Sequence, residues 1–263
     1  MNFNFSNKTI LIGGATDGIG WACSKIFASM GANVIMLSRN IDKLNDKCES
    51  LQNNGTQNHK VVAIDYTVPD ELERKFKKFI LENNIEIDII INNTGGPPGG
   101  QLSDSNSNEL INAFNMHVIS FHKILGLTLE KMKNREYGRI INIISTSVKQ
   151  PLNGLGVSNT IRGAVANWAK TLANELGQFN ITVNNVLPGA TNTGRLNEII
   201  RAKAKKMDAS EETISTAMAN EVPMKRIAEP NEVANAVVFL ASQNASYING
   251  INLPVDGGRT KSL

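Results

Sequence analysis

The sequence predicts an α/β protein in which a doubly wound, parallel sheet of about seven strands forms a single domain over residues 1–263. Three observations support this fold class. Short runs rich in Ile and Val alternate with helical patterns along the whole chain. The runs are almost continuously apolar, as expected of parallel strands that helices cover on both faces. A chain of this length can also bury one sizeable hydrophobic core.

The expected elements follow one another in a regular order. Strands are expected at 8–14, 33–39, 60–67, 87–95, 138–146, 181–189 and 250–258. Helical patterns separate them, at about 18–30, within DKLNDKCESLQ, within DELERKFKKFILEN, up to about Lys133, at 157–177 and within NEVANAVVFLASQ. Repeated strand–helix–strand units with right-handed crossovers build a doubly wound sheet, and ligands bind beyond the carboxyl ends of its strands.

Composition and charge exclude several classes of function. The formal net charge is +3, and the basic residues are spread along the chain, whereas proteins that bind nucleic acids concentrate them in a patch. The densest basic run, at 201–212, ends in acidic residues, which is typical of a solvated helix. No stretch reaches the roughly 18–20 apolar residues that a membrane span needs. We therefore expect neither a nucleic acid nor a membrane as a partner.

The cysteines and histidines indicate the compartment and the absence of a metal centre. Cys23 and Cys48 form no CxxC pair and lie in expected helices, so buried, reduced thiols are expected. The three histidines show no spacing typical of metal ligands. The N-terminal segment lacks the basic start and the cleavage site of a signal peptide. We therefore expect a cytoplasmic protein without a bound metal.

A glycine-rich segment, GGATDGIG at 13–20, joins the first expected strand to the first helix. Gly14, Gly18 and Gly20 lack Cβ atoms, which permits a tight turn and a close approach of the backbone to a ligand. The N-terminus of the following helix offers free N–H groups to a pyrophosphate. In this position the glycine pattern predicts a dinucleotide-binding site, with a purely structural turn as the alternative.

The sequence resembles the short-chain dehydrogenase/reductase family over almost its whole length. The shared motifs are the glycine segment with Gly13 in place of the family's Thr, NNTG at 92–95, the Pro188–Gly189 pair and VDGG at 255–258. The resemblance implies a single-domain Rossmann fold with a nicotinamide dinucleotide, whose adenine would contact Asp65 and whose carboxamide end would contact Thr193. The residues that it implies for cofactor binding are Gly14, Thr16, Gly18, Ile19, Gly20, Asp65, Asn92, Thr94, Gly95, Arg162, Pro188, Gly189 and Thr193.

The end of the second expected strand favours NADP(H) over NAD(H). An acidic residue there would bind the 2′-hydroxyl of the adenosine ribose, whereas an arginine accommodates a 2′-phosphate. The strand ends with Ser38 and Arg39, and a guanidinium together with a hydroxyl suits a phosphate. Asp17 is the opposing signal, because NADP-dependent members of the resembled family often have a basic residue in the glycine segment.

The catalytic positions depart from the pattern of the resembled family. That family protonates the alkoxide with a Tyr, holds the nicotinamide ribose with a Lys four residues later, and binds the substrate oxygen with a Ser thirteen residues before the Tyr. Ser145 matches the serine, but Ser158 stands at the tyrosine position and Arg162 at the lysine position. Arg162 can still donate hydrogen bonds to ribose hydroxyls, although it stays protonated. Ser158 is shorter and far less acidic than a phenol, so we expect a water to fill the gap.

His117 is the other candidate for moving a proton. Ungapped alignment back from Arg139 places it where the family has a catalytic Asn, with Asn115 two residues away. An imidazole can act as an acid or a base near neutral pH. A partly buried helical histidine without a catalytic role is the alternative.

Two segments resemble a divergent branch of the family that lacks the YxxxK motif. GGPPGG, at 95–100, follows the fourth expected strand, and its prolines stiffen the loop. VSNTIR, at 157–162, stands where the YxxxK motif would be.

Three functions are consistent with these residues. The first is that of an NADP(H)-dependent oxidoreductase that interconverts a carbonyl and an alcohol on a small molecule, using Ser145, Arg162 and either Ser158 with a water or His117. The second is that of a catalytically silent dinucleotide-binding protein, such as a redox sensor or a partner subunit. The third is a different chemistry on the same fold, such as that of a lyase or an epimerase.

Two further expectations concern the flap and the assembly. The polar helical segment at 190–225 resembles the family's substrate-covering flap, with a plain surface helix as the alternative. Members of the family are commonly tetramers that pack through the helices after the fourth and fifth strands, and Trp168 lies on the second of these. The resemblance therefore implies a homo-oligomer, either a tetramer or a dimer.

Overall fold

A parallel sheet with helices on both faces forms the body of the protein. The computed structural model describes residues 3–262, and within them the sheet has seven strands in the order β3-β2-β1-β4-β5-β6-β7. Every pair of neighbouring strands is parallel, which confirms the predicted fold class. The strands are β1 (Thr9–Gly13), β2 (Asn33–Ser38), β3 (Lys60–Ala63), β4 (Ile89–Asn92), β5 (Gly138–Ile143), β6 (Ile181–Pro188) and β7 (Asn252–Val255).

The helices fall close to the predicted positions, with one difference. They are α1 (Gly18–Ser29), α2 (Ile41–Glu49), α3 (Pro69–Glu82), α4 (Ser107–Phe114), α5 (Ser120–Asn134), α6 (Gly156–Leu176), α7 (Gly194–Met207), α8 (Glu211–Asn220) and α9 (Pro230–Ala241). The long helix expected before β5 is interrupted, because a π-helical turn, Asn115–Ile119, separates α4 from α5. Such turns add one residue to a helical ladder and often occur at functional sites.

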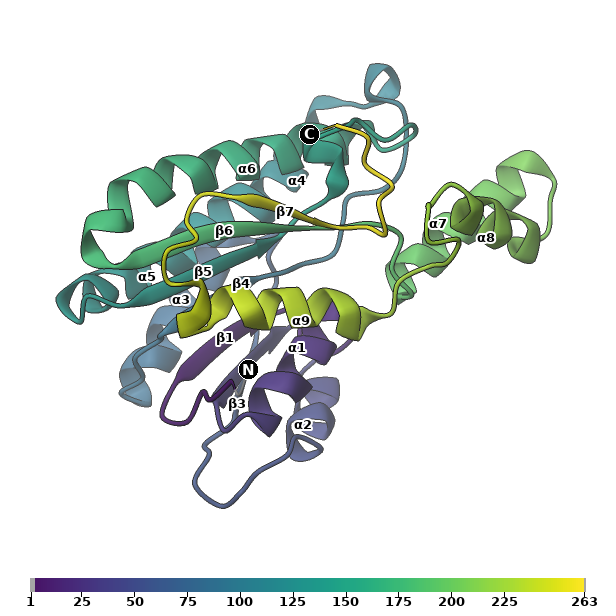
Figure 1. Cartoon of the computed structure of the whole chain (residues 1–263). Coiled ribbons are helices and arrows are strands. Elements are labelled where there is room, and N and C mark those ends of the chain that lie inside the picture. The colour runs from purple at the N-terminus through teal and green to yellow at the C-terminus, as the bar shows by residue number, and fades with distance from the viewer. Residues whose placement is uncertain (1–2, 263) are drawn as a thin grey trace.

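Alternate side chains of each strand enter two separate cores. On one face, Ile10 and Ile12 pack with residues of α1, α2 and α9. On the other face, Leu11 packs with residues of α3, α5 and α6. Figure 1 shows these helices on the two sides of the sheet, and α7 and α8 standing away from it beyond the end of β6. Because both faces are covered, the carboxyl edge of the sheet is the place where loops can build a site.

The segment that contains α7 and α8 is closed at its base. Thr191 and Ala228 form an isolated parallel bridge, and Asn192 N–H donates to the Ala228 carbonyl at 2.8 Å. The two helices also share a small apolar cluster of their own, around Leu196 and Ile214. The segment therefore leaves the sheet and returns to it at one point. Within residues 3–262, no helix combines the length and the apolar character that crossing a membrane requires.

A row of asparagine side chains crosses four neighbouring strands, from the last residue of β4 to the first residue of β7. Asn92 donates to Asn142 at 2.8 Å, Asn142 to Asn185 at 2.9 Å, and Asn185 to Asn252 at 2.8 Å. Each of these pairs is also a pair of partners in the strand register. The first three side chains are buried, so each amide depends on its neighbours for hydrogen bonds. The row therefore holds β4 to β7 in one register just below the loops of the site.

We expect Asn142→Ala to lower the free energy of unfolding by about 2–5 kcal/mol, because it leaves buried polar groups of two neighbouring asparagines without partners. Urea unfolding of the variant and the parent measures the difference. Asn112→Ala, at an exposed position on α4, is the control and should change stability by less than about 0.5 kcal/mol. Equal losses for the two variants would show that the row does not stabilise the sheet.

Candidate dinucleotide and catalytic site

The loop between β1 and α1 has the shape of a cradle for a pyrophosphate. Gly14 and Gly18 adopt positive φ angles, +55° and +51°, which glycine tolerates and other residues rarely adopt. A Cβ atom on Gly20 would lie 2.2 Å from the Gly14 carbonyl oxygen, so only glycine fits there. Asp17 caps α1 and accepts a hydrogen bond from Gly18 N–H at 2.8 Å. The geometry fits a bound dinucleotide, with the helix N-terminus open to the phosphates.

Asn93 supports this cradle, and sequence reasoning missed it. Its Nδ2 donates to the Gly13 carbonyl at 3.0 Å and lies 2.7 Å from the place where a Cβ on Gly14 would be. Asn92, which was expected at the cofactor, instead turns its buried side chain toward Asn142 inside the sheet. Neighbouring residues at the end of a strand point to opposite sides. The side chain of Asn92 therefore bonds to a neighbouring strand, and that of Asn93 bonds to the glycine loop.

The adenosine end of the site is formed by the ends of β1, β2 and β3. The hydroxyls of Thr16 and Ser38 lie 3.2 Å apart, and the exposed Arg39 follows β2 directly. Asp65 accepts hydrogen bonds through Oδ1 from the Thr67 N–H at 2.9 Å and the Thr67 hydroxyl at 2.7 Å. Both hydrogen bonds go to Oδ1, so they hold the carboxylate in place and leave Oδ2 able to accept a hydrogen bond from a ligand. The structure therefore brings the predicted adenosine-binding residues to one end of the cradle.

The candidate nicotinamide end, expected at Thr193, lies in the segment that follows β6. The Thr191 hydroxyl donates to the Gly189 carbonyl at 3.1 Å. Thr193 caps α7 by accepting from Leu196 N–H at 3.3 Å, and its own hydroxyl donates to the Thr191 carbonyl at 3.2 Å. The Thr193 methyl group lies 2.9 Å from the place where a Cβ on Gly18 would be. The start of the flap segment therefore touches the glycine loop.

Ser145 follows the end of β5, and Arg162 reaches the last residue of that strand. Ser145 Oγ accepts a hydrogen bond from Ser147 N–H at 3.1 Å, which leaves its own proton free to be donated. Arg162 comes from α6 and is only 7% exposed. Its Nη1 donates to the Ile143 carbonyl at 3.0 Å. Burial lowers the pKa of Arg162 to about 10, with a further contribution from the charge of Arg195, so the guanidinium stays protonated at neutral pH.

Ser158 lies in the first turn of α6, one turn before Arg162, and no tyrosine replaces its missing phenol. Tyr66 follows β3 beneath the glycine loop, where burial raises the pKa of its hydroxyl. Tyr137 precedes β5 at the opposite edge of the sheet, and Tyr247 is fully exposed after α9. These are all three tyrosines of the chain. The hydroxyls near the reacting position are therefore those of serine.

His117 is fully buried in the π-helical turn. Its Nδ1 donates to the Ala113 carbonyl at 2.9 Å, which places the proton of the neutral ring on that nitrogen. Burial lowers the pKa of His117 to about 3, and the charge of Arg162 adds to this effect, while the Ala113 and Gly95 backbones oppose it. The imidazole is therefore neutral at pH 7. This agrees with the expectation of a structural histidine and disfavours an imidazolium that donates a proton.

The GGPPGG loop is attached to the start of α6. Gly100 N–H donates to the Gly154 carbonyl at 2.8 Å, and Gly156 N–H donates back to the Gly100 carbonyl at 3.0 Å. Gly156 permits this contact because a Cβ there would lie 2.4 Å from the Leu102 backbone nitrogen. The loop after β4 and the helix that carries Ser158 are thus one unit.

Arg195 is the second site residue that sequence reasoning missed. It lies in the first turn of α7, and its Nη2 donates to the Pro97 carbonyl of the GGPPGG loop. Its Nε lies 3.3 Å from the place where a Cβ on Gly96 would be. A basic residue in a polar helix carries no sequence signal for this role, because the contact joins segments 98 residues apart.

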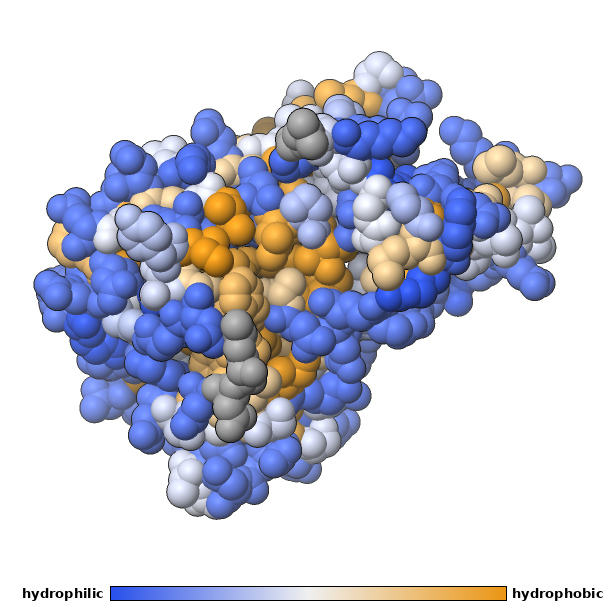
Figure 2. Space-filling view, viewed as in Figure 1, coloured by the Kyte–Doolittle hydropathy of each residue, from blue (hydrophilic) through white to orange (hydrophobic). Residues whose placement is uncertain are grey.

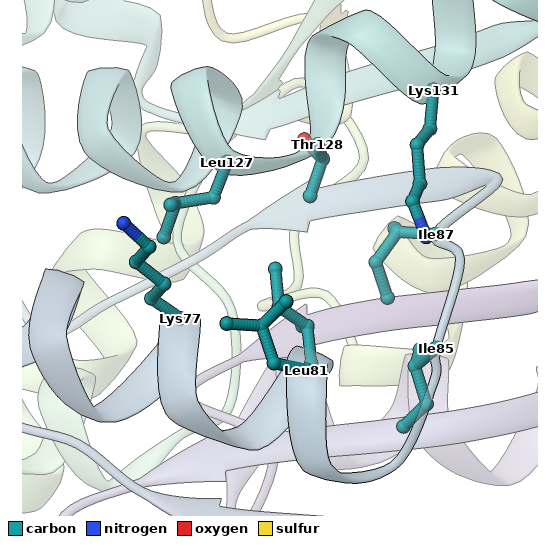
Figure 3. Close-up of a pocket in the computed structure, with 8 residues that line it drawn as sticks. Lys77, Leu81, Ile85, Ile87, Leu127, Thr128 and Lys131 are labelled. Carbon is teal, nitrogen blue, oxygen red and sulfur yellow. The ribbon is translucent and has the colours of Figure 1, made fainter.

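Of two cavities in the described chain, one lies far from these residues and the other is lined by the GGPPGG loop. Figure 3 shows the first, of about 180 Å³, between α3 and α5, lined by Lys77, Ile80, Leu81, Ile85, Ile87, Leu127, Thr128 and Lys131. It lies at the amino end of β4, away from the cradle. The second, of about 220 Å³, is lined by Pro97, Pro98, Gly99, Gly100, Gln101, Asp104, Ser105, Glu109 and Val157. The described part of the chain contains no cluster of three or more His, Cys, Asp or Glu side chains that could bind a metal ion.

The fold and the site have clear relatives. Residues 14–260 match the family described as enoyl-(acyl carrier protein) reductase. The chain is 28% identical to the NADPH-dependent reductase BacG of Bacillus subtilis, over 98% of this chain and 100% of that protein. It is 29% identical to the 7alpha-hydroxysteroid dehydrogenase of Escherichia coli, over 100% of this chain and 98% of that protein.

A solved structure shows the same architecture with a bound nucleotide. The L-sorbose reductase of Gluconobacter frateurii, complexed with NADPH and L-sorbose, has a TM-score of 0.93 and 29% identity, with complete coverage of both chains. The three relatives are named for different substrates or none, so the similarity does not identify a substrate for this chain.

We expect the buried His117 to make stability depend on pH. In the unfolded chain its pKa is about 6.5, and in the folded protein about 3, so the unfolded chain binds a proton first as the pH falls. Stability is therefore lost from about pH 6.5 downward, by up to about 1.4 kcal/mol per pH unit. His117→Asn should remove this contribution in urea unfolding between pH 7.5 and 4.5. His122→Asn, at an exposed position of α5, should keep it. Parallel curves for the parent and His117→Asn would contradict the assignment.

Proposed function

Because the chain belongs to the short-chain dehydrogenase/reductase family, we propose that it is an NADP(H)-dependent oxidoreductase that interconverts a carbonyl and an alcohol on a small molecule. One observation carries the proposal. The glycine cradle and the Ser145–Arg162 pair lie at the same edge of the sheet, and the start of the flap segment touches the cradle. A dinucleotide that extends from Arg39 past Gly18 would end beside Ser145.

The preference for NADP(H) is supported by the end of β2 and by relatives. Ser38 and Arg39 supply a hydroxyl and a guanidinium, and neither would repel a 2′-phosphate. BacG is named as NADPH-dependent, and the sorbose reductase was solved with NADPH. Asp17 remains the opposing signal, because its carboxylate stays in the glycine loop, where one oxygen caps α1.

The chain's own residues polarise the carbonyl and hold the reactants in place. When bound, the cofactor supplies or accepts the hydride at the substrate carbon. Ser145 donates its free proton in a hydrogen bond to the substrate oxygen, where negative charge develops. Arg162 stays charged and stabilises the same charge, while its remaining N–H groups reach the ribose hydroxyls.

The proton for the substrate oxygen comes through Ser158 and a water molecule. The serine hydroxyl is too short to reach the position of a phenol oxygen, and a bridging water spans the distance. His117 is the weaker candidate because its pKa of about 3 leaves it neutral at pH 7. The chain thus belongs to a divergent branch in which serine and arginine replace the YxxxK pair.

The flap, the assembly and the compartment complete the proposal. The segment 190–225 covers the substrate, because α7 begins at the cradle and reaches the GGPPGG loop.

The protein is a cytoplasmic homo-oligomer, and both Cys23 and Cys48 are free thiols. Figure 2 shows apolar side chains gathered near the centre of one face, in the region where Figure 1 shows β7 and α9. The partly exposed apolar residues of this region are Phe239, Ile248, Ile251, Leu253 and Val255.

We expect the protein to bind NADPH more tightly than NADH, and Arg39→Ala to remove most of the difference. Loss of a charge-assisted contact to the 2′-phosphate should weaken NADPH binding by about 10- to 100-fold and leave NADH binding unchanged. Fluorescence titration of both nucleotides measures the dissociation constants. Arg74→Ala, at an exposed position of α3, should have no effect. Tighter binding of NADH would refute the preference.

We expect NADPH oxidation with at least one carbonyl compound of a broad panel, and Ser145→Ala to lower kcat/KM by about 100-fold or more. The control is Ser246→Ala, at an exposed position after α9. If NADPH binds but no compound reacts faster with the parent than with Ser145→Ala, the protein is the catalytically silent nucleotide-binding alternative. That alternative is favoured only by the missing tyrosine.

A further inference from the structure

The candidate catalytic end has two guanidinium groups on adjoining elements: Arg162 lies on α6, and Arg195 contacts the loop that is hydrogen-bonded to the start of α6. Arg162 is buried. Its Nη1 donates a hydrogen bond to the Ile143 carbonyl, which carries no charge. After burial, the second cause of its lowered pKa is the positive charge of Arg195, and no carboxylate opposes these effects. A buried cation is costly unless an anion pairs with it. The residues that the structure describes leave this charge without a matching anion.

Arg195 connects the flap to the loop that follows β4. Its helix starts at Thr193, against the glycine loop, and its side chain reaches the loop after β4 at Gly96 and Pro97. That loop is hydrogen-bonded to the start of α6, which carries Ser158 and Arg162. Arg195 therefore joins the flap to the two elements that enclose the reacting position.

The acidic groups near Arg195 do not neutralise it within the site. Glu198 lies 3.4 Å from its Nη1, but this carboxylate is 68% exposed, and exposed pairs contribute little. Asp17 faces Gly194 and caps α1. Asp104 and Glu109 line the outer cavity, whose described lining includes neither Arg162 nor Arg195. A guanidinium has five N–H donors, so Arg195 retains donors for another anion.

We propose that the substrate carries a carboxylate and that Arg195 binds it, so that the enzyme acts on oxo acids or the corresponding hydroxy acids. This proposal rests on the proposed function. Ser145 would hold the carbonyl oxygen while Arg195 binds the carboxylate in the planar, two-point geometry that guanidinium groups favour. The bound anion also balances the charge of Arg162. Arg195 is thus a specificity-determining residue, contributed by the flap.

A purely structural role for Arg195 makes a different prediction. If its contact with Pro97 only holds the flap closed, loss of the side chain slows acids and neutral substrates equally. If it binds a carboxylate, the loss falls on acids. The comparison of an acid with its own ester therefore separates the two roles.

The test compares 2-oxopentanoate, 3-oxopentanoate and 4-oxopentanoate with their methyl esters, at saturating NADPH and constant ionic strength. The variants are Arg195→Gln, Arg195→Lys and the control Arg201→Gln, which removes an exposed arginine of the same helix. We expect the parent to prefer at least one acid to its ester. Arg195→Gln should lower that preference by about 10- to 100-fold, Arg195→Lys should lower it less, and Arg201→Gln should leave it unchanged.

The outcomes separate failure of this proposal from failure of the proposed function. A parent that prefers esters, or an equal fall for acids and esters in Arg195→Gln, overturns the proposal while the oxidoreductase function stands. If none of the six compounds reacts, the test becomes a measurement of the melting temperature with NADPH present. The shift that pentanoate produces is then compared with the shift that pentanamide produces. A shift with pentanoate that Arg195→Gln abolishes supports the carboxylate site without turnover. No shift in the parent overturns it.

Discussion

The burial of a parallel sheet between two helical layers constrains every other feature of this protein. Ile10 and Ile12 pack toward α1 and α9, and Leu11 packs toward α5 and α6, so neither face of β1 is open to a ligand. The ends of the strands are then the places where polar groups can gather. The row of asparagines from Asn92 to Asn252 crosses four of these strands, and its amides hydrogen-bond one another from strand to strand.

At this edge the cofactor end and the catalytic end differ in how closely they follow the family pattern. The cradle depends on close contacts between backbone segments. Gly20 and Asn93 leave little space there for a larger side chain. The proposed catalytic end depends on side-chain chemistry, and in our proposal serine and arginine take the roles of tyrosine and lysine there. A guanidinium in place of an amine keeps the hydrogen bonds to a ribose but adds a permanent charge. The charge of Arg162 adds to the effect of burial in lowering the pKa of the neighbouring His117.

The positive charge links the flap to the chemistry. Arg195 touches the loop after β4, and its charge acts on Arg162. A flap that carries a cation into the site closes most favourably over an anion, which couples the choice of substrate to closure. The same contact with Pro97 orders the GGPPGG loop, whose other end is attached to α6.

The sequence by itself determined the fold class, the approximate positions of the seven strands along the chain and the position of the glycine loop, because hydrophobic periodicity and glycine spacing are local properties of the chain. Through the family resemblance it also nominated Ser145, Ser158 and Arg162 as catalytic residues, and that assignment stays a prediction. The strand ends were predicted one to four residues too long, since apolar residues such as Ile64 continue past the last paired residue.

Only the tertiary structure decided which asparagine of NNTG faces the loop, how deeply His117 is buried, and that Arg195 reaches Pro97. These facts depend on contacts between segments far apart in the chain, for which no local pattern exists.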